Sequence, residues 1–135
     1  MVNWTNNENL IEELQDQVSG TLVRHKSILD IMTKLDEYNA RINRAVAKSV
    51  TSCGCIKIEA EKQDISSESL SDALTKVDSH VVGEICPNCK EVLEQEIGAY
   101  IYFLASLANT LDFSLKETVE KELNRTRTLG VYGMK

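Results

Sequence analysis

The chain has 135 residues, of which 42% are hydrophobic, and a formal net charge of -6 at pH 7. This length suits one domain, residues 1–135, that buries roughly two thirds of its unfolded surface. The acidic balance argues against a basic face for nucleic acid or an anionic membrane, so we expect neither partner. The longest apolar run, residues 99–108, covers about half of a membrane span.

Apolar residues recur at three- and four-residue spacing along most of the chain, which contains one proline and six glycines. This pattern predicts an all-α protein. The first helix is expected to be short and to end near Gly20, with its apolar face formed by Leu10, Ile11, Leu14 and Val18. A long second helix is predicted from about Ser27 to Ser49, with a core stripe of Ile28, Met32, Leu35, Ile42 and Val46.

The periodicity breaks between Thr51 and Ile58, and the polar stretch 59–69 predicts a loop. A short helix near 70–77 and a turn through His80 and Gly83 are expected next. Pro87 can occupy the first turn of a second long helix, which should end near Thr110.

The helix at 87–110 is apolar on nearly every side, through Leu93, Ile97, Tyr100, Ile101, Phe103, Leu104 and Leu107. Its short neighbours cannot cover so much apolar surface, so we predict a homodimer formed through Ile101, Phe103 and Leu104. Ser114 to Glu117 has the spacing of a capping box and opens a last helix. That helix should turn Leu115, Val119 and Leu123 inward and be followed by a tail, residues 126–135.

The cysteines form two close pairs, Cys53-Gly-Cys55 and Cys86-Pro-Asn-Cys89, and the chain has no others. Such pairs suit a tetrahedral thiolate site better than two disulfides, because a ring closed across one or two residues is strained. We predict a structural zinc ion that joins the end of one long helix to the start of the other.

Three alternatives to zinc remain open from the sequence. Iron-sulfur ligation also uses four thiolates, and Cys86 with Cys89 has the spacing of a thioredoxin-like redox pair, although that motif normally follows a strand in a βαβ unit. Four free thiols are the third alternative.

The first residues lack the basic and then apolar run of a secretory signal, so we expect a reducing, cytoplasmic location.

Residues 93–104 and 107–123 carry a family resemblance: an acidic start, an apolar run, a short turn and a capped helix. This order resembles the second half of a MazG-like domain, from the all-α nucleoside triphosphate pyrophosphohydrolase superfamily. The resemblance covers about 91–123 well and 28–49 weakly, and the cysteine-containing insert, residues 51–89, is foreign to the basic pattern. The insert and the ending at 128–131 are similar to a group of bacterial MazG-like proteins.

The resemblance implies a MazG-like bundle of four to five helices that pairs into larger bundles, and the cysteine spacing adds a zinc-stapled insert between the two long helices. In the family, an E-E-x-x-E cluster and an E-x-x-D pair hold Mg²⁺ against nucleotide phosphates. Carried over, the E-x-x-D pair falls on Glu96 and Ala99, and the first cluster falls on Glu37, Tyr38 and Arg41. Glu37 and Glu96 are thus the candidate catalytic residues of a degraded site, and Mg²⁺ is expected only if the chain is active.

Three basic residues, Arg41, Arg44 and Lys48, lie on one side of the first long helix. They could bind a nucleotide or phosphate through their charged donors, or they could be ordinary surface charges with Glu37 and Arg41 as an ion pair. The sequence therefore supports two function classes. One is a nucleotide-binding protein with little or no hydrolysis, and the other is a non-enzymatic, zinc-stabilised assembly or partner-binding module.

Overall fold

The computed structural model describes residues 8–66 and 69–133, which are mostly helical. The α-helices are α1 (Leu10–Thr21), α2 (Ile28–Lys48), α3 (Leu70–Lys76), α4 (Pro87–Thr110) and α5 (Leu115–Leu129). A π-helical segment, η1 (Ser49–Cys53), continues α2, and a 3-10 turn, η2 (Gly130–Gly133), follows α5. The all-α prediction is confirmed at this level. No helix in the described ranges is both long enough and apolar enough to cross a membrane.

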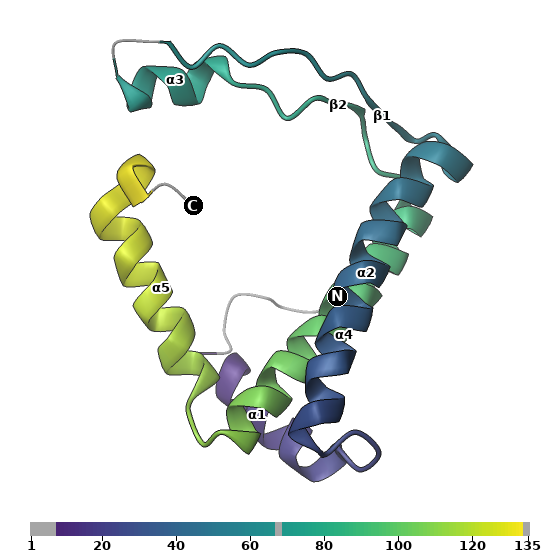
Figure 1. The fold of residues 1–135 in the computed structure, drawn as a ribbon, viewed down its shortest axis with the longest axis vertical. Helices are drawn as coiled ribbons and strands as arrows, with labels where there is room; N and C mark the ends of the chain where they lie inside the picture. Colours follow the sequence, from purple (N-terminus) through teal and green to yellow (C-terminus); the bar gives the residue numbers. More distant parts are fainter. Residues whose placement is uncertain (1–7, 67–68, 134–135) are drawn as a thin grey trace.

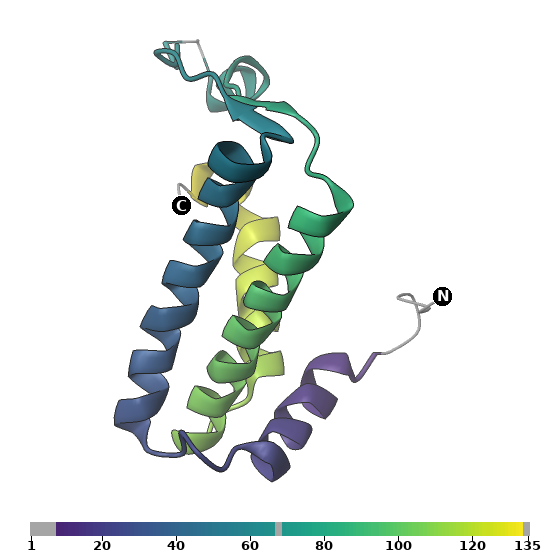
Figure 2. The same cartoon turned by 90° about the vertical axis from the view of Figure 1, so that its right-hand side faces the viewer.

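The two long helices, α2 and α4, run antiparallel side by side (Figures 1 and 2). Ile31 of α2 is fully buried, and Tyr38 stacks on the buried Phe103 of α4 with ring centroids 5.6 Å apart. Helix α1 packs on α4, where the small residues Ala105 and Ala108 are fully buried and allow a close approach. The core therefore lies where α1, α2 and α4 meet.

Side-chain caps explain the helix starts. The Ser27 hydroxyl accepts a hydrogen bond from the Leu29 amide, and the Ser114 hydroxyl accepts one from the Glu117 amide. Each satisfies one of the amides that the first helical turn leaves without an intrahelical partner.

The predicted helix from Pro87 to Thr110 is confirmed at both ends.

The predicted core stripe of α2 is wrong at two positions. Met32 is 54% exposed and Val46 is 38% exposed, whereas the neighbouring Ile31 is fully buried. The reason is that α4 packs against one edge of the apolar stripe rather than its middle. The other edge, with Met32 and Val46, stays exposed among the described residues.

Helix α5 also differs from its prediction. It continues to Leu129, so residues 126–129 belong to the helix and not to a tail, while 134–135 lie outside the described residues. Val119 and Leu123 are exposed rather than inward. After contacts with α1 and α4, α5 runs apart from the α2 and α4 pair, on the opposite side of the molecule in Figure 1.

The insert between the long helices contains a hairpin-like sheet that the sequence did not predict. Strands β1 (Ile56–Ile58) and β2 (Val81–Gly83) pair antiparallel, with Ile56 opposite Gly83. The predicted turn through His80 and Gly83 is therefore partly strand, because strands of three residues leave no recognisable alternation. Beyond the sheet the insert extends as an arm to α3, which contacts η2 (Figure 1).

Candidate metal centre and adjoining groove

The first cysteine pair lies where α2 ends. Segment η1 carries Cys53 at its last position, and Gly54 then adopts a φ of 75°, which glycine tolerates best. The Gly54 amide donates to the Ser49 carbonyl, 2.9 Å away, and turns the chain so that Cys55 directly precedes β1. The two thiols are thereby placed on either side of a tight helix end.

The second pair lies where α4 begins. Cys86 is the N-cap residue, and its sulfur accepts a hydrogen bond from the Cys89 amide at 3.4 Å. The β1 and β2 pairing returns the chain to the first pair, and at Gly83 the backbones come so close that a Cβ atom would lie 2.7 Å from the Cys55 carbonyl oxygen. Glycine at position 83 therefore permits the strand approach that positions the two pairs together.

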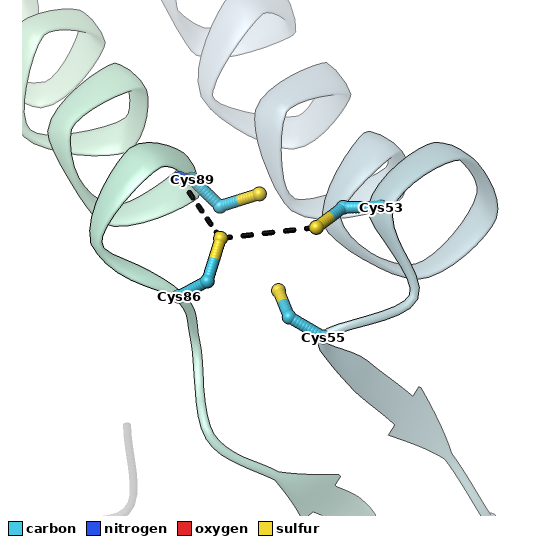
Figure 3. Close-up of side chains that lie close together, drawn as sticks. All are labelled: Cys53, Cys55, Cys86 and Cys89. Carbon is cyan, nitrogen blue, oxygen red and sulfur yellow. Dashed lines mark hydrogen bonds between the residues drawn. The ribbon is translucent and has the colours of Figure 1, made fainter.

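The four thiols converge between the two helix ends, as Figure 3 shows. All four sulfurs lie within 4.8 Å of one another, and the Sγ atoms of Cys53 and Cys86 are 3.7 Å apart. In a tetrahedron with Zn–S bonds of about 2.3 Å, neighbouring sulfurs are about 3.8 Å apart. The predicted set of Cys53, Cys55, Cys86 and Cys89 is thus assembled with the spacing of ligands around one metal ion.

This geometry bears on the alternatives to zinc. All four cysteines are free, and 3.7 Å is far beyond the S–S bond length of about 2.05 Å. An iron-sulfur cluster needs room for several iron and sulfide atoms between its thiolates, which sulfurs this close do not leave. A two-stranded antiparallel sheet precedes Cys86, so the βαβ context of a thioredoxin-like pair is absent from the described residues.

The thiols differ in acidity. The hydrogen bond from the Cys89 amide is the main reason that the pKa of Cys86 falls to about 7. Ser49 acts to lower the pKa of Cys89, but the neighbouring thiols, chiefly Cys86, together with burial raise that pKa to about 12. Crowded thiols oppose each other's ionisation in this way until a cation is present, and a divalent metal ion supplies the charge that favours thiolates.

A groove of about 670 Å³ adjoins the thiols and lies between α2 and α4. Its lining includes most of the residues that the sequence nominated, namely Glu37, Arg41, Arg44, Lys48, Cys53, Cys89 and Glu96. The sequence reasoning missed Ser52 and Asn88, which also line it. Asn88 lies inside the second cysteine motif, but an asparagine there carries no signal of its own.

Arg41 occupies the position between the two candidate catalytic acids. Its guanidinium lies 3.8 Å from Glu96 and 3.9 Å from Glu37, and it also lies over the Tyr38 ring. Glu37 makes a closer pair with Lys34 at 3.0 Å, and that hydrogen bond is the main reason for its lowered pKa. The structure therefore brings Glu37 and Glu96 into one groove, but with a cation between them.

Arg44 and Lys48 are different. Among residues 8–66 and 69–133, no carboxylate pairs with either side chain, although both line the groove. Tyr38, which takes the place of an expected acid, is used in the core against Phe103. The groove thus offers unpaired positive charge where the resemblance implied metal-binding carboxylates.

No protein-family model matches the chain, and neither a curated protein nor a solved structure matches it. The resemblance of residues 91–123 to MazG-like domains accordingly remains a prediction from the sequence.

Proposed function

We propose that this chain is a zinc-clasped helical protein that binds a phosphate-bearing ligand, in the first instance a nucleotide, without hydrolysing it efficiently. The observation that carries the proposal is the groove in which no carboxylate of the described residues pairs with Arg44 or Lys48, while Arg41 is placed between the two acids. Arginine and lysine donors suit phosphate oxygens. The MazG-like resemblance supports a nucleotide as the source of that phosphate.

The choice of zinc rests on ligand chemistry. Four thiolates in a closed tetrahedral set are typical of structural zinc, and the ion would tie η1 to the first turn of α4. Thiolate ligands stay reduced and available in a reducing compartment, which supports a cytoplasmic location. The ion's role here is to hold two helix ends, since all four ligand positions belong to the protein.

The metal centre also sets where an anion can bind. A zinc ion with four thiolates has a net charge of -2, and Cys53 and Cys89 line the groove. Lys48 is the groove cation nearest to Cys53 along α2, and it offsets part of this charge. We therefore assign the phosphate chiefly to Arg44, which lies one helical turn farther from the thiols.

Efficient hydrolysis is not part of the proposal. Mg²⁺ requires several oxygen ligands, and a site that activates water must hold the ion firmly. Glu37 and Glu96 are both paired with cations, and Ala99 has no ligand atom. Mg²⁺ would have to displace Arg41 before it could reach both carboxylates.

The test is a thermal-shift and calorimetric titration with a nucleoside triphosphate, using Arg44→Ala as the site variant. A ligand at a hundredfold excess over its Kd stabilises the folded state by about 2.7 kcal/mol, so binding should raise the melting temperature. A hydrogen bond to a charged group is worth about 1.5–3 kcal/mol, so Arg44→Ala should weaken binding roughly ten- to a hundredfold.

Arg127→Ala is the matched control, because it removes the same charge from an exposed position on α5. The assignment fails if the wild-type protein shows no binding, or if Arg127→Ala weakens binding as much as Arg44→Ala.

A second candidate function is favoured by a separate observation. Helix α5 carries exposed apolar residues and lies apart from the long helix pair. We therefore also propose a non-enzymatic role in which the zinc-stabilised helices assemble into a homodimer.

A further inference from the structure

Helix α5 has an apolar stripe, formed by Leu115, Val119, Leu123 and Leu129, that the described part of the chain leaves largely exposed beyond the half-buried Leu115. Val119 is 43% exposed, Leu123 is 44% exposed and Leu129 is 49% exposed, and no residue of α5 is buried. The residues of this α5 stripe are spaced by four, four and six positions, and at 100° per residue they lie within about 120° of the helix circumference. An isolated helix of fifteen residues gains little stability from propensity alone, so such a face indicates a packing partner.

The position of α5 is fixed by specific contacts at its start. The Gln15 side chain donates to the Phe113 carbonyl and accepts from the Leu115 amide, both at 2.9 Å. Lys116 pairs with Glu12 of α1 at 3.5 Å, and Asp112 in the connecting turn has a φ of 58°. Helix α5 could not swing onto its own α2 and α4 without breaking these contacts, so the described residues of its own chain, 8–66 and 69–133, do not supply the missing cover.

A second apolar surface lies on the long helix pair. It consists of Met32 and Val46 of α2 with Ile97 and Ile101 of α4, all at least 38% exposed, and we call it the α2/α4 flank. At 100° per residue, Met32 and Val46 lie nearly half a turn from Arg41, Arg44 and Lys48. The flank is therefore on the side of the pair away from the anion groove.

The total surface indicates how much cover is missing. The chain exposes 10566 Å². A folded monomer of 15.1 kDa is expected to expose about 7,100 Å², so the excess is about 3,500 Å². Part of this excess belongs to the extended arm of the insert. A standard interface nevertheless needs only about 800 Å² from each partner, and obligate homodimers bury a total of roughly 2,000–5,000 Å².

We propose that two copies of this chain pair reciprocally, with the α5 stripe of each copy packed on the α2/α4 flank of the other. This arrangement deepens the second candidate function by naming its interface. It is isologous, because each copy contributes the same two surfaces, and a two-fold pairing closes without leaving a free surface for further growth. Both anion grooves remain on the outside.

The proposal also corrects the interface expected from the sequence. Phe103 is only 8% exposed and is stacked on Tyr38 of its own chain, so it is not available to a partner. Ile101 stays in the interface as part of the flank. Val119 and Leu123 of the α5 stripe, which the sequence predicted to be inward, become inward only in the pair.

The first test is the mass of the full chain in solution, measured by light scattering at micromolar concentration. We expect about twice 15.1 kDa for the wild type and 15.1 kDa for Leu123→Asp. Asn124→Asp is the matched control, because it introduces the same residue next along α5, away from the stripe, and should leave the dimer intact. A monomeric wild type would overturn the proposal, as would a dimer that Leu123→Asp does not weaken.

A mixing experiment tests the reciprocal packing itself. The flank variant Ile101→Asp should be monomeric, like Leu123→Asp, because each homodimer would contain two damaged contacts. A mixture of the two variants contains heterodimers in which one stripe and one flank are both unchanged, so association should partly return. No recovery on mixing would overturn the reciprocal arrangement.

Folding and groove binding serve as independent readouts. Each variant should keep its helical circular dichroism, its bound zinc and its triphosphate-induced melting shift, because the interface lies away from both sites. Failure of the interface proposal would thus be seen as a monomeric wild type, or as a variant with the same mass as a dimeric wild type. Failure of the groove proposal would be seen as absent triphosphate binding, whether the protein is a monomer or a dimer.

Discussion

The guanidinium of Arg41 lies 3.8 Å from a carboxylate oxygen of Glu96, and the same group lies 3.9 Å from Glu37. An exposed ion pair of this kind adds at most about 1 kcal/mol to stability. Its larger effect is on chemistry, because Arg41, together with Lys34 beside Glu37, places positive charge next to both acids that could have bound Mg²⁺ in the groove.

We expect no appreciable Mg²⁺-dependent release of pyrophosphate from nucleoside triphosphates. A shared metal site loses several kcal/mol of transition-state stabilisation when its carboxylates are missing or neutralised, which corresponds to at least a hundredfold in rate. The measurement is pyrophosphate release across a panel of standard and modified triphosphates. Robust turnover that Glu37→Gln or Glu96→Gln abolishes would contradict the assignment of a degraded site.

Replacing Arg41 by an acid should change the metal preference of the groove. Arg41→Glu would gather three carboxylates where the wild type has a cation between two, so Mg²⁺ should raise the melting temperature of this variant but not that of the wild type. Lys34→Glu is the control, because it reverses a charge beside Glu37 outside the groove lining. An equal Mg²⁺ effect in both variants would show general charge screening.

Freshly reduced protein should contain about one zinc ion per chain. A structural zinc site contributes on the order of 10 kcal/mol to the folding of its surroundings, so chelation or Cys86→Ser should lower the melting temperature sharply. Elemental analysis checks the metal, and Ser52→Ala tests a groove residue that is not a ligand. Metal-free wild-type protein with an unchanged melting temperature would rule out the clasp.

In metal-free protein, Cys86 should be the most reactive thiol. Its pKa is lowered to about 7, so its thiolate fraction, and with it the alkylation rate, should rise with pH around neutrality. Cys89, with a pKa raised to about 12, should react slowly over the same range. Mass spectrometry of iodoacetamide-treated protein between pH 6 and 9 measures both rates, and added Zn²⁺ should protect both cysteines. Faster alkylation of Cys89 than of Cys86 would contradict the assignment.

Gln15→Ala should loosen the attachment of α5. The change removes both side-chain hydrogen bonds to the α4–α5 turn, each worth about 0.5–1.5 kcal/mol, so the free energy of unfolding should fall by about 1–3 kcal/mol. Gln17→Ala, at an exposed position of the same helix, should change it by less than about 0.5 kcal/mol. Urea denaturation at fixed protein concentration measures both, and equal losses would mean that Gln15 does not anchor the turn.

Local features explain why the sequence predicted the helices well. Ser27, Pro87 and Ser114 mark helix starts through hydrogen bonds or a fixed φ that involve only neighbouring residues. The cysteine spacing is equally local, since each pair lies within four residues of chain. These signals were sufficient for the all-α class, for the bounds of α4 and for the grouping of four thiols.

Long-range contacts decided the rest. Only the folded chain shows that α4 covers the Ile31 edge of α2 and leaves Met32 outside, that Arg41 reaches Glu96, and that Gln15 holds α5 apart. Periodicity identifies an apolar face but not the neighbour that covers it, because that neighbour comes from a distant segment or from another copy of the chain. The sequence thus determined which residues carry thiol, cationic and apolar side chains, and the tertiary structure decided which of them lie together.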